Sequence, residues 1–477
     1  MEVAIKTTPT LLGDHPTVSL SGASPVKPDY CPDELWGYVQ NRYAGGQESA
    51  YLWHSGRNLA FFKFPQKSSD HILLESRRKQ GFEALNTLAK DEITSLQIDG
   101  HAVGKYEVLA FLEGYLLSSY SFTRYKSEKK ANPLKEVFVH ADAVSQADLD
   151  EIKAVVQGVF AARDLVNTPV IDLNAEQFSE EIKSLGQKHG FDVDVFNESK
   201  ILSLKMGGLL AVNAGSEDPP TFNILEYKPD NSINDRPIVL VGKGVMYDTG
   251  GLSLKPTPNS MDMMKSDMGG AACVAGAFAA VAAARLPIHL VGLIPATDNR
   301  LNGNAVAPGD VITMYSGKTV EVMNTDAEGR LILADALHYA KKYNPELVMD
   351  FATLTGAAMR AIGKEGIVCM GTAAEQEKAQ LIKAGEQAYE RLVEFPLWEE
   401  YKAQLHSDIA DISNLGGDSA GAITAGVFLQ YFTDYPWMHF DIAGSAFLKG
   451  GDSYKGKGGT GAGVRLLFTF LKNGANG

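Results

Sequence analysis

The stretch Asn324-Thr325-Asp326-Ala327-Glu328-Gly329-Arg330-Leu331 places two carboxylates two positions apart and follows them with glycine and arginine. Residues 319–322 before it predict a short strand, and the apolar residues after it recur at helical spacing. We therefore expect Asp326 and Glu328 on a turn between the carboxyl end of a strand and a helix, where open α/β sheets bind ligands. Taken alone, the stretch also suits a solvated acidic turn or a helix cap.

A second stretch, residues 238–272, begins with a predicted buried strand and ends in an alanine-rich helix. Lys243 and Asp248 follow the strand across a glycine-containing turn, and Asp267 lies just before the helix. If these aspartates met the two carboxylates of the first stretch, the four would repel strongly unless cations compensated them. Oxygen-rich sites suit Mg²⁺ and Mn²⁺, and an added nitrogen ligand suits Zn²⁺ or Co²⁺.

Three segments, GKGVMYDTGGLSLKP (242–256), MDMMKSDMGGAA (261–272) and NTDAEGRL (324–331), resemble the motifs of the leucyl (cytosol) aminopeptidase family of dinuclear metallopeptidases. The similarity runs from about residue 163 to the C-terminus, and residues 113–126 show a weaker similarity. Between the first two segments the chain is slightly longer than the family pattern. We expect the added length to bulge the loop and leave Asp267 in place.

The resemblance implies two divalent metal ions per subunit, Mn²⁺ or Zn²⁺. Lys243, Asp248, Asp267 and Glu328 would hold the tighter ion, and Asp248, Asp326 and Glu328 the more exchangeable one, so that Asp248 and Glu328 bridge. Lys243 can bind metal only as the neutral amine, which nearby cations favour. Two adjacent metals would activate a water molecule and polarise the scissile carbonyl. Binding of the substrate's free α-amine to a metal would restrict cleavage to the N-terminus.

The resemblance also implies that Lys255 and Arg330 are catalytic residues that bind no metal. A protonated Lys255 would contact the substrate and stabilise the tetrahedral oxyanion. The planar fork of Arg330 suits a small oxyanion, and in the family it holds a bicarbonate that serves as general base. No histidine or other free carboxylate near these motifs is an obvious base.

By resemblance, the substrate's first side chain enters a pocket, and the Leu354 backbone contacts the substrate. A pocket lined by methionine and alanine favours leucine or a similar apolar residue. Core packing is the alternative for each lining residue. The implied lining residues are Met264, Thr353, Gly356, Ala443 and Ala446.

Each charged residue also has an ordinary structural explanation. Lys243 suits a surface lysine after a strand, and Lys255 a loop charge. Arg330 suits a simple ion pair with Glu328, and Asp267 a helix N-cap. Together, these explanations leave the order and spacing of the motifs unexplained.

Composition narrows the functional classes. The chain has 477 residues, 45% hydrophobic and 21% charged, with a net charge of −14. This charge argues against general binding to nucleic acid or anionic membranes. The three cysteines are dispersed along the chain. The N-terminus does not resemble a signal peptide, and no uncharged apolar run is long enough to span a membrane. These features predict a cytoplasmic protein.

Alternating strand and helix patterns predict an α/β fold with a mostly parallel sheet flanked by helices. We expect a small N-terminal α/β domain over 1–144, with residues 1–35 loosely structured. A connecting helix follows over 145–168, and a larger catalytic domain over 169–477. The family resemblance implies a homohexamer.

The sequence therefore predicts a dinuclear-metal aminopeptidase that releases N-terminal residues, preferably leucine, from peptides with a free N-terminus by means of a metal-activated water. The alternative is a regulatory or DNA-binding protein on the same scaffold.

Overall fold

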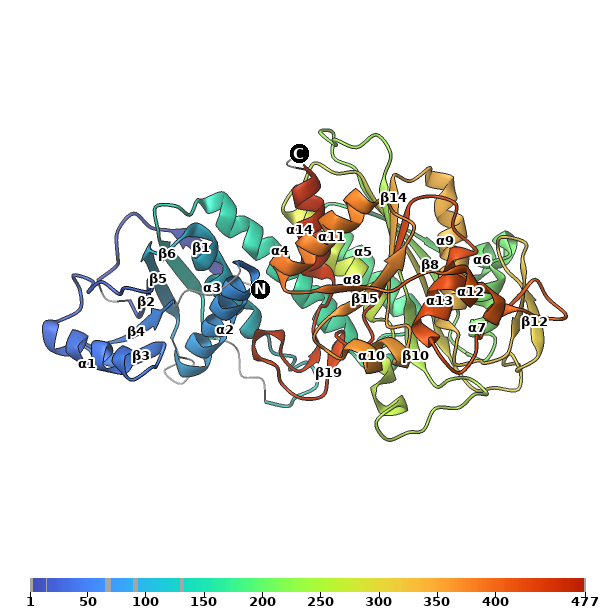
Figure 1. Cartoon of the computed structure of the whole chain (residues 1–477), viewed down its shortest axis with the longest axis horizontal. Helices are drawn as coiled ribbons and strands as arrows, with labels where there is room; N and C mark the ends of the chain where they lie inside the picture. Colours follow the sequence, from blue (N-terminus) through green and yellow to red (C-terminus); the bar gives the residue numbers. More distant parts are fainter. Residues whose placement is uncertain (1–2, 14, 65–69, 89–92, 129–132, 476–477) are drawn as a thin grey trace. The chain divides into compact units, whose positions relative to one another are not determined.

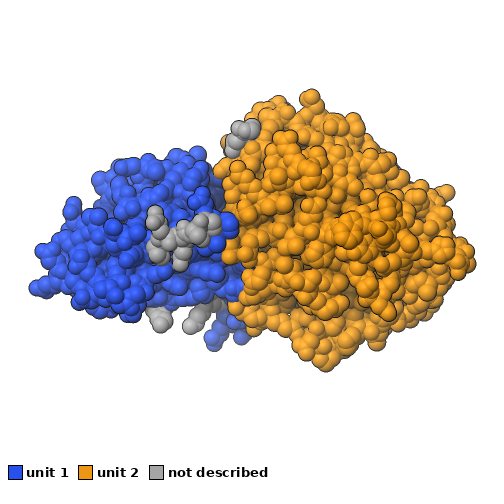
Figure 2. All heavy atoms as spheres, in the orientation of Figure 1, with its two compact units in different colours: residues 1–157, 452–456 blue, residues 158–451, 457–477 orange. Residues whose placement is uncertain are grey.

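The computed structural model describes residues 3–13, 15–64, 70–88, 93–128 and 133–475. The chain forms two compact units, residues 1–157 with 452–456 and residues 158–451 with 457–477 (Figure 2). The helix predicted between the domains is present as α4 (Gln146–Asn167). A capping box starts this helix: Asp148 Oδ2 accepts from the Ser145 amide at 2.9 Å, and Ser145 Oγ accepts from the Asp148 amide at 3.3 Å. The domain limits 1–144, 145–168 and 169–477 stay a prediction.

Unit 1 contains a six-stranded sheet in the order β1-β6-β5-β2-β4-β3, with every neighbouring pair parallel except the hairpin β3–β4. Its strands are β1 (Ala4–Thr7), β2 (Thr17–Ser21), β3 (Ser49–His54), β4 (Arg57–Lys63), β5 (Ser95–Ala102) and β6 (Glu136–His140). Its helices are α1 (Asp33–Ala44), α2 (Asp70–Leu88) and α3 (Lys105–Ser118).

The expectation of a loosely structured start was wrong, since β1 and β2 are paired strands. All five residues of β2 are buried because the strand lies between β5 and β4. The expectation rested on the polar composition of residues 1–35 and their several Pro and Gly, but β2 pairs with a neighbouring strand on both edges, so its backbone groups are satisfied.

Residues 452–456 complete unit 1 although they come from near the end of the chain. The Tyr454 hydroxyl donates to Glu75 Oε2 at 2.7 Å, and both side chains are buried. A buried carboxylate needs such partners, because desolvation is costly without them.

Unit 2 is built on a nine-stranded sheet in the order β16-β15-β18-β14-β9-β11-β8-β7, with β10 paired to β11. Only the β15–β18, β11–β8 and β8–β7 pairs are antiparallel, which confirms the predicted mostly parallel α/β sheet. The strands are β7 (Asp192–Phe196), β8 (Thr221–Tyr227), β9 (Ile238–Gly242), β10 (Gly244–Asp248), β11 (Leu290–Asn299), β14 (Leu347–Ala352), β15 (Ile367–Gly371), β16 (Leu392–Glu394) and β18 (Trp437–Asp441).

Helices flank this sheet (Figure 1). The set packed around α8 comprises α5 (Ala175–His189), α8 (Gly269–Ala283) and α14 (Val464–Ala475), with α11 (Glu375–Ala388) against α14. The set packed around α9 comprises α7 (Gly207–Asn213), α9 (Gly329–Ala340) and α13 (Gly421–Gln430). The α9 set shares one apolar core with the strands β9, β11 and β14.

A separate three-stranded sheet contains β12 (Asp310–Thr313), β13 (Thr319–Val322) and β17 (Ile412–Ser413). The strand before Asp326 is therefore real, but it belongs to this small sheet and not to the main one. The sequence pattern could not show this, because strand pairing is set by contacts far apart in the chain.

Among the residues that the structure describes, one helical stretch, Met261–Ala283, is long and apolar enough to cross a membrane, with a mean hydropathy of 1.4 in its most apolar window. Within the protein, 94% of that window is buried. Burial of this kind is typical of a core helix, and α8 forms most of the stretch.

Two glycines allow α8 to approach α4 closely. A Cβ placed on Gly276 of α8 would lie 2.5 Å from the Gly158 carbonyl oxygen of α4, closer than real Cβ atoms come. By contrast, a Cβ on Gly474 of α14 would meet no atom within 4 Å.

We predict that Gly276→Ala lowers the free energy of unfolding by about 1–3 kcal/mol, because the added methyl overpacks a backbone contact. The matched helical substitution Gly474→Ala should change it by about 1 kcal/mol or less, in the stabilising direction. Urea denaturation followed by circular dichroism measures both. Equal effects of the two substitutions would contradict the close approach of α4 and α8.

A charge pair lies inside the main sheet. His439 Nδ1 of β18 lies 2.6 Å from Asp350 Oδ1 of β14, and both side chains are fully buried. Burial disfavours the imidazolium, but the Asp350 carboxylate more than offsets this and raises the pKa of His439 above its ordinary value. His439 is thus a structural histidine.

A His pKa raised on folding stabilises the protein below the unfolded value of about 6.5, and this stabilisation is lost as the pH rises through the folded value. We predict that the free energy of unfolding falls as the pH rises above about 6.5, and that His439→Gln makes this slope shallower by up to about 1.4 kcal/mol per pH unit. Chemical denaturation at several pH values measures the slope. An unchanged slope in the variant would rule out titration of His439.

Candidate metal centre

Four segments of unit 2 bring the predicted metal ligands together. Lys243 follows β9, and Asp248 ends β10. Asp267 follows the 3-10 helix η3 (Met261–Ser266), and Asp326 and Glu328 lie between β13 and α9. The residues between Lys243 and Asp248 were expected to form a turn, but they form the strand β10 and pair with β11.

Lys243 is at the centre of this arrangement. Its Nζ lies 2.8 Å from the Asp267 carboxylate and 2.9 Å from Glu328 Oε1, and only 2% of the residue is exposed. A Cβ on Gly329 would lie 2.4 Å from Lys243 Cε, so any larger residue at the start of α9 would displace the lysine side chain from this position. The structure thus excludes a surface lysine here.

Asp267 does not cap α8. The residue at the N-cap position is Met268, which makes no side-chain capping bond. The Asp267 carboxylate faces Lys243 and also accepts from the Thr353 hydroxyl at 2.9 Å. The loop before η3 turns at Asn259, where φ is 61°, and Asp267 still reaches Lys243.

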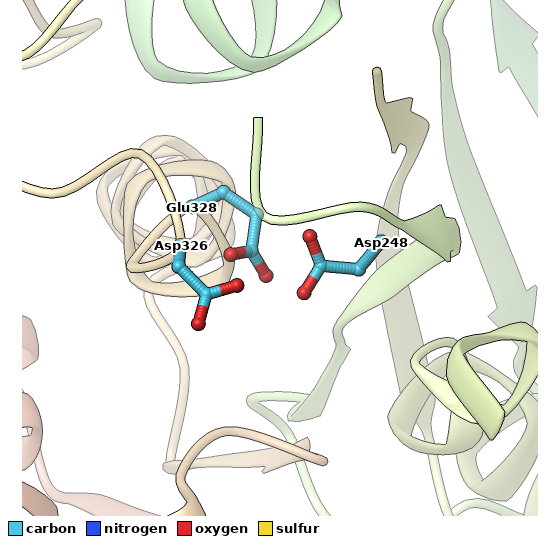
Figure 3. A group of neighbouring side chains, drawn as sticks. All are labelled: Asp248, Asp326 and Glu328. Carbon is cyan, nitrogen blue, oxygen red and sulfur yellow. The ribbon is translucent and has the colours of Figure 1, made fainter. Parts of the chain in front are cut away.

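Lys255 joins two of the other carboxylates. Its Nζ lies 2.8 Å from Asp248 Oδ2 and also contacts Asp326 Oδ1. Figure 3 shows the carboxylates of Asp248, Asp326 and Glu328 pointing toward one another, with that of Glu328 between the other two. Each offers an oxygen that lies within 4.8 Å of the others. Lys255 is therefore part of the cluster and not a free loop charge.

Two polar residues that the sequence did not single out support the cluster. The Asn299 side-chain amide donates to Asp248 Oδ1 at 2.8 Å and to the Thr325 carbonyl at 3.0 Å. The Thr325 hydroxyl donates to the Gly250 carbonyl at 2.7 Å and accepts from the Ser253 amide at 2.8 Å. These bonds hold the loop before Lys255 against the loop that carries Asp326. Thr325 belongs to the motif at residues 324–331, whereas no motif around Asn299 indicates its role in the sequence.

Arg330 lies in the first turn of α9 and is 6% exposed. Its Nη1 donates to the Asn414 carbonyl at 2.8 Å, and its Nε has no hydrogen-bond partner in the described chain. Among the described residues it forms no ion pair with Glu328. The Asn414 side chain also accepts from the Met323 amide at 2.8 Å and so fixes the start of the loop that carries Asp326 and Glu328.

Four carboxylates face two ammonium groups, which leaves excess negative charge in a buried space. Burial, and then the Glu328 carboxylate, raises the pKa of Asp248 to about 6. Burial also raises the pKa of Asp267 well above its ordinary value. For Lys243, burial alone would lower the pKa, but Asp267 and Glu328 reverse the direction and raise it. A divalent cation beside Nζ would favour the neutral amine instead.

The donor set fits divalent metal ions. It consists of carboxylate oxygens with one amine nitrogen, the types that Mn²⁺ and Zn²⁺ accept. Glu328 Oε2 is buried and has no hydrogen-bond partner among the residues that the structure describes. A cation would satisfy this oxygen and compensate the excess charge.

The predicted pocket residues lie on several segments of unit 2, and Thr353 contacts Lys243 and Asp267 directly. A Cβ placed on Gly269 would lie 3.1 Å from Thr353 Cγ2 and 3.2 Å from Ala446 Cβ, so both side chains lie next to Gly269. The Leu354 and Ala443 amides both donate to Asp441 Oδ1 at 3.1 Å. Met264 lies in η3, and Gly356 begins α10 (Gly356–Ile362). The role of all these residues in substrate binding stays a prediction.

Comparison with known proteins agrees with this geometry. The family profile described as "Cytosol aminopeptidase family, catalytic domain" matches residues 160–468. The chain belongs to the cytosol aminopeptidase family. As a family member it is a metal-dependent exopeptidase that removes N-terminal residues from peptides, and the predicted resemblance is confirmed.

Other members of the cytosol aminopeptidase family match the chain over most of its length. A "Probable cytosol aminopeptidase" of Chlorobium limicola is 48% identical, over 76% of this chain and 74% of the relative. One of Azotobacter vinelandii is 40% identical, over 87% of this chain and 88% of the relative. The solved structure "Bottromycin maturation enzyme BotP in complex with Mn" has a TM-score of 0.86 at 30% identity, covering 97% of this chain and all of that one.

We predict that Glu328→Gln, which keeps the shape and removes the charge, weakens Mn²⁺ binding at least about tenfold, because a central carboxylate is lost. Isothermal titration calorimetry measures the binding. The control Asp262→Asn changes a carboxylate of η3 that is 46% exposed and lies 3.9 Å from Lys449, and it should bind Mn²⁺ as the unmodified protein does. Unchanged affinity in Glu328→Gln would place the metal elsewhere.

Proposed function

We propose that unit 2 hydrolyses the N-terminal residue, preferably leucine or a similar apolar one, from peptides with a free α-amine. The observation that supports this most directly is the convergence of the buried Asp248 and Glu328 with the partly exposed Asp326. One buried Glu328 oxygen has no hydrogen-bond partner among the described residues. Because the chain belongs to the cytosol aminopeptidase family, we interpret this carboxylate cluster as a metal site for peptide hydrolysis.

The residues would hold two divalent ions, Mn²⁺ or Zn²⁺. Lys243, Asp267, Asp248 and Glu328 would bind the tighter ion, and Asp326 with Asp248 and Glu328 the more exchangeable one. Such a pair of ions supplies positive charge that makes water more acidic and polarises a carbonyl group. The central place of the Glu328 carboxylate in the cluster (Figure 3) fits a bridging role.

Lys255 would stabilise the developing oxyanion and contact the substrate. Its ammonium is held between Asp248 and Asp326. Burial alone would lower its pKa, but the carboxylates of Asp248 and Glu328 reverse the direction and raise it. A preorganised cation in a site with little water is effective in this role, because it needs no rearrangement during the reaction.

Arg330 would bind a bicarbonate ion that accepts a proton as the general base. Its guanidinium is buried, uses Nη1 for the Asn414 carbonyl, and leaves Nε without a partner among the described residues. A planar guanidinium matches the planar oxygens of such an anion.

The side chain of the first substrate residue would lie among Met264, Thr353, Gly356, Ala443 and Ala446, with the Leu354 backbone against the substrate. The hydrogen bonds of Thr353 to Lys243 and Asp267, and of Leu354 to Asp441, support a pocket close to the proposed metal ligands. Small and apolar lining residues favour leucine over charged residues.

We also propose a cytoplasmic location and a homohexamer. A sedimentation mass of one or two chains would contradict the hexamer. The regulatory or DNA-binding alternative gains no support from the comparisons, and the net charge of −14 argues against nucleic acid.

The purified protein should hydrolyse leucine p-nitroanilide and leave N-acetyl-leucine p-nitroanilide intact, because the acetyl group removes the free amine. Chelation should abolish the activity, and Mn²⁺ should restore it. Release of p-nitroaniline, read by absorbance, measures all three samples. A folded protein that is inactive with every divalent metal tested would refute the proposed function.

Lys255→Ala and Arg330→Ala should each lower kcat by about 10²–10³-fold, because each removes a charge that acts on the reacting groups. Binding of Mn²⁺ should remain, since neither residue is a ligand. Lys449→Ala is the control, because this lysine is 47% exposed and pairs at the surface with Asn259. A kcat unchanged in Lys255→Ala would contradict its assignment.

A further inference from the structure

Asp441, the last residue of β18, accepts hydrogen bonds with both carboxylate oxygens and is 2% exposed. Oδ1 accepts from the Leu354 amide and from the Ala443 amide, each at 3.1 Å. Oδ2 accepts from the Thr355 hydroxyl at 2.7 Å. One buried carboxylate thus joins the loop after β14 to the loop after β18.

The peptide group between Thr353 and Leu354 lies between two buried charges. Its N–H donates to Asp441, and its carbonyl accepts from Lys243 Nζ at 3.0 Å. A trans peptide is planar, with its N–H and C=O pointing in opposite directions. Asp441 therefore fixes the orientation of the carbonyl that Lys243 contacts.

Neighbouring hydroxyls hold the same segment. The Thr353 hydroxyl donates to Asp267 at 2.9 Å, and the Thr355 hydroxyl, which donates to Asp441, also accepts from the Ala358 amide at 3.0 Å. The segment 353–355 is therefore held at both ends, by Asp267 on one side and by Asp441 on the other.

We propose that Asp441 is a positioning residue for the metal centre and for the side-chain pocket. Through the 353–354 peptide it fixes Lys243, and through Leu354 and Ala443 it sets the separation of two pocket walls. The proposal rests on the proposed function for the roles of Lys243 and of the pocket. It assigns Asp441 no contact with substrate or metal.

The simpler explanation is that Asp441 only stabilises the core, and Asp350 provides the comparison. Asp350 is fully buried in the adjacent strand β14, where it accepts from Trp437 Nε1 at 2.7 Å and pairs with His439. These partners lie in β18, so Asp350 stabilises the sheet without holding either loop. Asp350→Asn thus imitates the loss of a buried carboxylate while leaving the segment 353–355 in place.

The test compares Asp441→Ala, Asp441→Asn and Asp350→Asn with the unmodified protein. Asp441→Asn keeps one oxygen for the two amides and replaces the other with an amide nitrogen, so its effect should be intermediate. Three quantities are measured: Mn²⁺ affinity by calorimetry, kcat/KM for leucine and alanine p-nitroanilides, and hydrogen exchange of a peptide covering 351–358.

In Asp441→Ala we expect the dissociation constant of the tighter Mn²⁺ to rise by about tenfold or more, as is usual when a group that orients a ligand is removed. The preference for leucine over alanine should fall, and exchange at 353–355 should become faster. Asp350→Asn should lower the melting temperature and leave all three quantities unchanged.

Melting temperatures that fall equally in the Asp441 and Asp350 variants, with metal affinity, preference and exchange unchanged, would overturn the proposal. If Asp441→Ala does not fold, unchanged affinity and exchange in Asp441→Asn overturn it equally. An unmodified protein without aminopeptidase activity would refute the proposed function alone, because calorimetry and hydrogen exchange still test how Asp441 acts on the segment 353–355.

Discussion

The buried ammonium of Lys243 organises unit 2 around the carboxylate cluster that we propose as the metal centre. It lies at the end of β9, and its Nζ contacts carboxylates from two other segments, Asp267 after η3 and Glu328 before α9. Without those partners, burial of the charge would be costly. The three segments must therefore meet for the lysine to be buried, and Gly329 leaves the space in which they do so.

The main sheet and the small sheet contribute different parts of the site. β9 and β14 are adjacent parallel strands, so Lys243 and the segment after Ala352 emerge at the same edge. Asp326 and Glu328 reach that edge from β13 of the small sheet. The Asn299 side chain joins the two contributions, because it donates both to Asp248 and to the Thr325 carbonyl.

The sequence predicted the parts of this site that carry local signals. Short motifs identified the charged residues, and the alternation of strand-like and helix-like apolar patterns identified the main strands and helices. Each of these patterns can be recognised from residues that are close together in the sequence. Asn299, Asn414 and Asp441 were missed, since each acts by hydrogen bonds to segments distant in the chain. The same reason explains why the sequence did not show that β13 belongs to a separate small sheet, and why β2 was expected to be loosely structured.

The return of the chain to unit 1 at residues 452–456 has a consequence for how the protein is made. A ribosome releases the strands and helices of unit 1 long before it synthesises Tyr454. Until then the buried Glu75 lacks the hydroxyl that donates to it at 2.7 Å. The N-terminal unit therefore reaches its final packing only after most of unit 2 has been synthesised. Cutting the gene after the codon for residue 157 would thus yield an incomplete fold.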